Sequence, residues 1–372
     1  MLSTPMGGTA SEPAAWQTRL VRADVSSGWD GRTWTSEVLE PGFRADQAVA
    51  SWNLEADAAA LIELRARTLD GTWHPWQEAA FWGGPGGRRS PAPPAGSDGQ
   101  GPQVDGPTVQ TDILTARSGE LFDAAQLRIT LLDGLHEATV PPPLHLAALS
   151  FSAPGGSDGD ESDADERRGA EPVGAAAALQ PLSQRAYPSR PDLGGGGPAW
   201  CSPTSLTMVL TAWGAQLPSA APTEVPADAD PRVPWMARAV YDAAFDGTGN
   251  WSFNAALAGE FGFDAVVTRL ASLQSARVLT EAGIPLIASI AFEAGRLLGA
   301  DYDTSGHLLV IRGFDSRGDV LVADPANPGG REGLRTYPRE AFDAAWSRSR
   351  RTVYLITPRG HALPAVTDDG GW

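Results

Sequence analysis

Residues 194–213 read GGGGPAWCSPTSLTMVLTAW, and this stretch decides how the second half of the chain folds. Its apolar side chains recur at positions i, i+3, i+4 and i+7, namely Leu206, Val209, Leu210 and Trp213. Such spacing places them on one face of an α-helix. Pro203 is suited to a first helical turn, where its missing N–H leaves no bond unmade, so we expect the helix to start around Cys201 and Pro203.

Cys201, the only cysteine, therefore stands at a predicted helix start. The unpaired N–H groups and the positive end of the helix dipole favour a thiolate there, and a thiolate is a nucleophile near neutral pH. The alternative is a buried structural cysteine, and the sequence leaves both interpretations open. A single cysteine also excludes an intramolecular disulfide, a CxxC redox pair and a cysteine-rich metal site.

The charge composition of the 372 residues excludes several further classes of function. All 28 residues of the Lys and Arg class are arginine, so P-loop nucleotidases, protein kinases and pyridoxal-phosphate enzymes, which need a lysine, are excluded. A net charge of −17 disfavours nucleic acid and anionic membrane surfaces as partners. No motif calls for a metal or an organic cofactor, and we expect none.

Neither a membrane span nor a secretion signal is visible. The longest apolar stretch, around residues 284–292, is far shorter than the roughly 20 residues of a spanning helix. The first 20 residues lack a charged segment followed by an apolar one. We therefore expect a cytoplasmic protein by default, or a secreted or cell-wall-associated one if the true start lies upstream.

An acidic stretch at residues 153–178 predicts a disordered linker between two domains. Six acidic residues fall between Asp158 and Glu166, with almost nothing apolar to bury. The linker separates an N-terminal domain, residues 14–152, from a C-terminal domain, residues 179–360.

The N-terminal domain has the period-two pattern of β-strands. Residues 62–67, for example, alternate apolar and charged side chains and lead into the turn dipeptide Asp70-Gly71. We expect about eight strands, at residues 18–25, 34–40, 47–54, 60–69, 73–82, 108–116, 125–132 and 144–152. This number suits an all-β antiparallel sandwich or jelly roll. Residues 83–107, rich in Gly and Pro, are expected to form a long disordered loop.

The C-terminal domain has an α+β pattern. Beyond the helix that follows Cys201, helices are expected at residues 235–245, 254–261, 273–281 and 339–346. Strands are expected at residues 284–291, 307–314, 319–323 and 352–356.

A nucleophilic thiolate needs a base, and the base needs an acceptor that orients it. Of the five histidines, His307 stands at the mouth of a predicted buried strand. The next predicted strand ends at Asp324, so a hairpin would make His307 and Asp324 cross-strand neighbours. The alternatives are a solvated strand-end histidine and an aspartate that only begins a turn before proline.

Several segments together resemble the C39-like cysteine peptidases, which are common in bacteria and have a papain-like fold. They are Ser183-Gln184, 200–205, 249–254, 283–285, 306–310, 324–326 and 337–339. The resemblance implies that Cys201 is the nucleophile, His307 the general base and acid, and Asp324 the residue that orients the imidazole. It also implies Gln184 as a donor to the oxyanion. The chain departs from the family in two places: Gln184 stands 17 residues before Cys201, further than in many members, and Ala323 replaces a frequent Asn.

The resulting hypothesis is a peptidase that hydrolyses a peptide or protein substrate, for example a cell-wall peptide. One alternative is an inactive papain-like protein whose sandwich binds carbohydrate. The other is an acyltransferase that uses the same three residues. A possible glycan site in the N-terminal domain rests on four tryptophans, Trp29, Trp34, Trp73 and Trp76, which could equally be core or strand-pairing aromatics.

Overall fold

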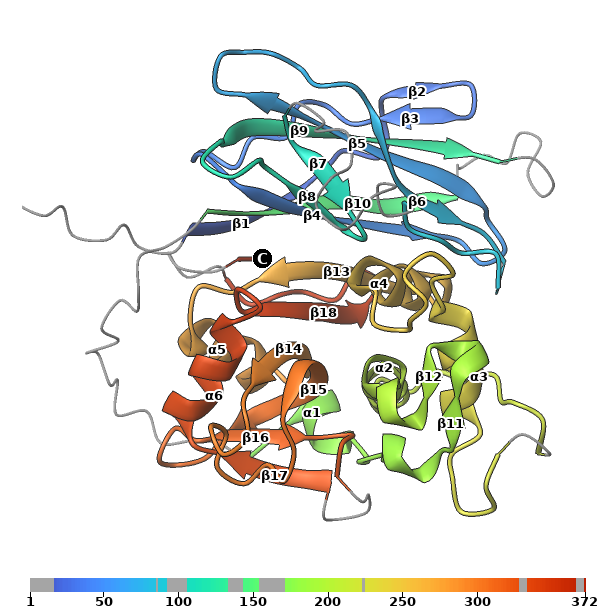
Figure 1. Cartoon of the computed structure of the whole chain (residues 1–372), viewed down its shortest axis with the longest axis vertical. Helices are drawn as coiled ribbons and strands as arrows, with labels where there is room; N and C mark the ends of the chain where they lie inside the picture. Colours follow the sequence, from blue (N-terminus) through green and yellow to red (C-terminus); the bar gives the residue numbers. More distant parts are fainter. Residues whose placement is uncertain are drawn as a thin grey trace, which may run out of the picture.

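The computed structural model describes residues 17–84, 86–91, 106–132, 143–153, 171–222, 225–327, 333–365 and 371–372. Figure 1 shows two parts packed against each other: two stacked β-sheets from the first half of the chain, and a sheet with helices from the second half. The expected order of an all-β region followed by an α+β region is confirmed. Among the described residues, no helix is long and apolar enough to span a membrane.

The N-terminal part consists of two five-stranded sheets in which every pairing is antiparallel. In order, the first sheet contains β1 (Gln17–Arg22), β10 (Leu144–Ala153), β4 (Gln47–Leu54), β8 (Ile113–Thr115) and β7 (Thr108–Gln110). The second contains β2 (Trp29–Asp30), β3 (Thr33–Thr35), β9 (Phe122–Leu131), β5 (Ala60–Thr68) and β6 (Gln77–Trp82).

Alternating burial explains why these sheets stack. On β5, Ile62 and Leu64 are fully buried whereas Glu63 and the next alternate residues face outward. Apolar faces from both sheets form one core, in which the rings of Phe122 and Phe151 lie 6.3 Å apart. The core therefore lies between the sheets, as two-layer packing requires.

The loop after β6 is more ordered than the sequence suggests. Residues 92–105 lie outside the described part, but residues 86–91 pack on the C-terminal half. Arg88 is 2% exposed and forms an ion pair with Glu260 at 2.6 Å. The prediction of a disordered loop is wrong for residues 86–91, because a buried guanidinium needs fixed partners.

The C-terminal part contains a six-stranded antiparallel sheet. Its order is β13 (Phe263–Arg269), β18 (Thr352–Pro358), β14 (Leu286–Phe292), β15 (Thr304–Phe314), β16 (Val320–Ala323) and β17 (Leu334–Tyr337). Helices α2 (Cys201–Ala212) and α4 (Trp251–Glu260) pack into the core on one face, next to α3 (Arg232–Val240). Helices α5 (Leu273–Glu281) and α6 (Arg339–Ser347) pack on the other face. The expected helices and strands are present, except that the helix expected at residues 235–245 ends at Val240. Strands β13 and β17 were not predicted.

The end of the predicted linker is also structured. Residues 154–170 lie outside the described part, whereas Gly174–Ala178 form α1, which contacts α2 and β15. Ala175 and Ala176 are buried there. The expectation of disorder is wrong for this end of the linker, since the small alanine side chains fit against the C-terminal core.

Side chains of the N-terminal sheet satisfy the backbone of β13, the edge strand that faces them. The Asn53 amide bonds both the N–H and the C=O of Ala265, at 2.9 and 3.0 Å. Ser51 Oγ accepts the N–H of Val267, and further along the strand Thr18 Oγ1 donates to a carbonyl. An unpaired sheet edge is a site of aggregation, so the N-terminal part protects the edge of the C-terminal sheet.

Candidate active site

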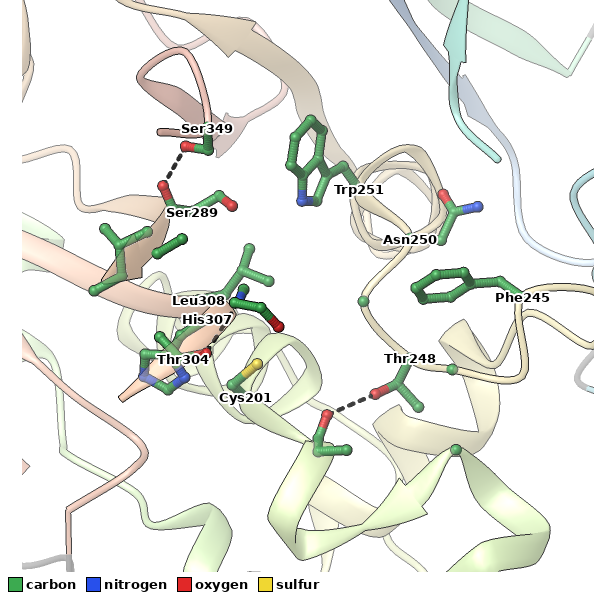
Figure 2. Close-up of a pocket in the computed structure, with 18 of the residues that line it drawn as sticks. Cys201, Phe245, Thr248, Asn250, Trp251, Ser289, Thr304, His307, Leu308 and Ser349 are labelled. Atoms are coloured by element: carbon green, nitrogen blue, oxygen red, sulfur yellow. Dashed lines mark hydrogen bonds between the residues drawn. The ribbon is translucent and has the colours of Figure 1, made fainter. Parts of the chain in front are cut away.

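Cys201 is the first residue of α2 and lines a cleft of about 1230 Å³ (Figure 2). The indole of Trp200, which precedes the helix, donates to the carbonyl of Leu193 at 3.0 Å and fixes this start. Burial raises the pKa of the Cys201 thiol, but a hydrogen bond and charge from His307 and the N–H groups of Leu308 and Ser202 outweigh burial and lower it. The site therefore favours a thiolate.

His307 reaches this thiol from β15, and Asp324 lies behind its ring. His307 Nε2 is 2.9 Å from Asp324 Oδ1, so the other ring nitrogen is available to Cys201. The expected hairpin explains this contact: Val310 of β15 pairs with Ala323 of β16, and Asp324 follows directly. Burial lowers the pKa of His307, but the Asp324 carboxylate outweighs it and the pKa rises to about 10. Both shifts favour the charged forms of the two groups, the thiolate and the imidazolium.

Asp324 is fully buried and accepts four hydrogen bonds. Besides His307, the donors are the N–H of Ala326 at 2.9 Å, the Tyr302 hydroxyl at 2.8 Å and the Tyr337 hydroxyl at 2.6 Å. Burial alone would raise the pKa of Asp324, but the positive charge of His307 and the hydrogen bonds from His307, Tyr337 and Tyr302 lower it to about 2. The carboxylate is therefore held ionised and in one orientation.

The two tyrosines were missed by the sequence reasoning. Tyr337 lies in one of the family-like segments, and Tyr302 lies in no recognisable pattern. The Tyr302 ring also contacts the His307 ring edge to face, with centroids 5.2 Å apart. Only the three-dimensional arrangement shows that both hydroxyls meet at Asp324.

Gln184 lines the same cleft despite its distance from Cys201 in the sequence. It begins a short 3-10 helix, η1 (Gln184–Ala186), and its N–H donates to the Pro325 carbonyl at 2.9 Å, beside Asp324. Its Nε2 donates to the Pro198 carbonyl at 3.0 Å. The glycine run lets the segment that contains Gln184 pack against the residues just before Cys201. A Cβ on Gly197 would lie 2.2 Å from the Tyr187 carbonyl oxygen, so only glycine allows this close approach.

Cys201, His307, Asp324 and Gln184 are thus brought together at one place, and their catalytic roles stay a prediction. The cleft has further walls, to which the sequence analysis assigned no role. One is the segment 245–251, which includes Phe245 and Trp251 (Figure 2). Another comes from the N-terminal half, at residues 110–113.

The tryptophans of the possible glycan site are largely engaged in the fold. Trp34 is fully buried, and Trp29 pairs with it across β2 and β3. Trp73 and Trp76 each stack on the Arg65 guanidinium, with 4.7 and 4.5 Å to the ring centroids. The prediction that Trp34 is exposed to bind a sugar is therefore wrong. Glycan binding by this domain stays a prediction.

Comparisons with known proteins agree with the resemblance seen in the sequence. The model of the peptidase C39 like family matches residues 178–354, and the model of the peptidase C39 N-terminal domain matches residues 2–152. No curated protein and no solved structure matches the chain. The chain therefore belongs to the C39-like peptidase family.

Proposed function

We propose that the chain hydrolyses peptide bonds through a Cys201, His307 and Asp324 triad, in a C-terminal domain of papain-like fold. The observation that carries the proposal is the placement of three groups at the wall of an open cleft. The His307 imidazole lowers the pKa of the Cys201 thiol, and its Nε2 is 2.9 Å from the buried carboxylate of Asp324. Nucleophile, base and orienting acceptor in this order are what thiol-dependent acyl transfer requires.

The packing of α2 on the sheet supports the papain-like arrangement. The helix that begins with the nucleophile contacts β15, the strand that contains the base. Ser205 Oγ on α2 donates to the Leu308 carbonyl at 3.0 Å, next to His307. This bond fixes the helix start relative to the imidazole, so that the two reacting groups are held in register.

The chemistry proceeds in two steps. The Cys201 thiolate attacks the carbonyl carbon, and the N–H of Cys201 together with Gln184 Nε2 donates to the oxygen as it becomes negative. One Nε2 hydrogen of Gln184 is used by Pro198, which leaves the second for this oxygen. The His307 imidazolium then protonates the amine, which departs and leaves a thioester. His307 next takes a proton from water, which attacks the thioester and releases the acid and the thiolate.

The two alternatives predict different outcomes in the same site. An inactive binding protein would tolerate a cysteine and a histidine that do not interact, or a filled cleft. Here His307 lowers the pKa of the Cys201 thiol, and both residues line an open cleft. An acyltransferase would pass the acyl group from Cys201 to an amine instead of water. A peptide substrate, including a cell-wall peptide, remains the proposal for the natural substrate.

The test uses the single cysteine. Because Cys201 is the only thiol, incorporation of one iodoacetamide label per chain reports that residue alone. We expect rapid labelling at pH 7, cleavage of a peptide library by the wild type, and no cleavage by Cys201→Ala or Cys201→Ser. Labelling as slow as that of a neutral buried thiol, or cleavage retained in Cys201→Ala, would contradict the proposal. Product analysis with an added amine separates hydrolysis from acyl transfer.

A further inference from the structure

The N-terminal half contributes a hairpin to the cleft that contains Cys201. Strands β7 and β8 pair through Gln110 and Ile113, so Thr111 and Asp112 form a two-residue turn between them. All four residues line the cleft. The substrate site is therefore walled by both halves of the chain.

This hairpin is tied to the C-terminal half at its tip. Asp112 Oδ2 accepts the N–H of Trp251 at 2.7 Å, at the first residue of α4. Asn250 caps the same helix by accepting the N–H of Phe253 at 3.0 Å. The hydrogen bond from Trp251 joins the tip of the hairpin to the start of α4, so the tip keeps a defined position at the cleft.

Thr111, at that tip, has a backbone conformation that its side chain disfavours. Its φ is 54°, in the left-handed region, where a β-branched residue is rare and glycine is usual. Strain of this kind persists at functional positions when the side chain itself is needed. Because Thr111 lines the cleft, its side chain can contact a bound substrate directly.

The segment 245–251 presents an exposed aromatic ring to the same cleft. Phe245 is 51% exposed, and its ring lies over the backbone of Gly247. In Figure 2, Phe245 and Trp251 lie on one side of the cleft, and Ser289 and Ser349 lie on the other.

A buried carboxylate keeps this exposed ring on a rigid support. Asp242 is fully buried and accepts the Asn250 amide at 2.8 Å and the Phe245 N–H at 3.3 Å. It also accepts the N–H of Ser90, from the N-terminal half, at 2.9 Å. An apolar group that is exposed yet held in place loses little conformational entropy when a ligand covers it.

We propose that Phe245, Trp251 and Ile113 form a subsite for one large apolar side chain of the peptide substrate, with Thr111 beside it. Specificity is then shared between the two halves of the chain. The inference rests on the proposed peptidase function, and the tests below distinguish failure of the subsite from failure of the peptidase function.

The first test measures kcat/KM on a peptide library for wild type, Phe245→Ala and Ile113→Ala. Wild type prefers Phe or Leu at one substrate position, and both variants lose about 10-fold on those peptides and less than about 3-fold on peptides with Ala there. Matched controls are Leu69→Ala and Leu298→Ala, whose side chains are 44% and 73% exposed and lie outside the cleft. A wild type without any apolar preference, or variants with an unchanged profile, overturns the subsite.

The second test uses Thr111→Gly, which relieves the backbone strain and removes the side chain. We expect a melting temperature equal to or above that of wild type, together with an altered preference at the same substrate position. A higher melting temperature with an unchanged profile would assign Thr111 to the turn alone and overturn its part in the subsite.

Iodoacetamide labelling of Cys201 is measured in every variant. Rapid labelling and cleavage with unaltered specificity refute only the subsite, whereas slow labelling in wild type refutes the peptidase.

Discussion

The pKa values of Asp324 and Asp112, two aspartates near the cleft that contains Cys201, shift in opposite directions. Burial raises the pKa of each, yet the pKa of Asp324 falls to about 2 and that of Asp112 rises to about 6. Asp324 belongs to the C-terminal half, behind His307, and Asp112 belongs to the N-terminal half, at the tip of the β7–β8 hairpin.

Their neighbours explain the difference. Asp324 faces the His307 imidazolium and two tyrosine hydroxyls, and a cation with several donors outweighs the cost of burial. Asp112 accepts backbone N–H groups, including that of Trp251, but the nearby carboxylate of Asp242 raises its pKa further. Burial alone therefore does not decide whether a carboxyl is ionised; the cation and the donors around it do.

The largest effect is expected when the acceptor of the triad is removed. Asp324→Ala leaves His307 without its orienting partner, and kcat/KM should fall by roughly 10³- to 10⁴-fold. Asp324→Asn keeps an acceptor but loses the charge, so the pKa of His307 should fall and the loss of activity should be smaller. Steady-state kinetics and the pH dependence of Cys201 labelling measure both effects. Equal activity in Asp324→Ala and wild type would remove Asp324 from the mechanism.

The sequence anticipates contacts within a hairpin better than contacts between distant segments. His307 and Asp324 are 17 residues apart on consecutive strands, and their proximity follows from the hairpin. Asp112 and Trp251 are 139 residues apart, and no local pattern connects them. Strand β13 was not predicted because six of its seven residues are buried, so its sequence lacks the alternation of apolar and polar residues that marks a half-exposed strand.

An intermediate effect is expected when one donor to Asp324 is removed. Asp324 Oδ2 accepts the hydroxyls of both Tyr302 and Tyr337, and Tyr337→Phe removes the second of these hydrogen bonds. The free energy of unfolding at pH 7 should therefore fall by about 1–3 kcal/mol. We also expect kcat to fall about 10-fold with little change in KM, since a less fixed Asp324 orients His307 less well.

The pH dependence tests whether this effect acts through Asp324. A carboxyl whose pKa is lower in the folded than in the unfolded state stabilises the fold above about pH 4 and loses that contribution toward pH 2. The difference in unfolding free energy between wild type and Tyr337→Phe, measured by urea unfolding, should therefore shrink as the pH falls from about 4 toward 2. Tyr241→Phe is the matched control, because its hydroxyl bonds the exposed Asp246 at 2.7 Å, and its deficit should stay under about 0.5 kcal/mol. A deficit in Tyr337→Phe that is independent of pH would indicate lost packing instead.

The smallest effect is expected at Asp112, with the opposite sign. Its folded pKa of about 6 lies above the usual value of about 4, so the folded state binds the proton more tightly. Between pH 4 and pH 6 the unfolded state is therefore the less protonated one, and stability falls as the pH rises. Asp112→Asn keeps an acceptor for Trp251 and removes the titration.

The variant should match wild type near pH 4 and exceed its stability by about 1–2 kcal/mol at pH 8. Urea unfolding of both proteins from pH 4 to pH 8 measures this difference. Because the amide oxygen of the variant would still hold the hairpin tip, Cys201 labelling should be unchanged, which separates this carboxylate from the one behind His307. A variant that is less stable than wild type at pH 8 would mean that the N-terminus of α4 compensates the charge of Asp112 as fully as His307 compensates that of Asp324.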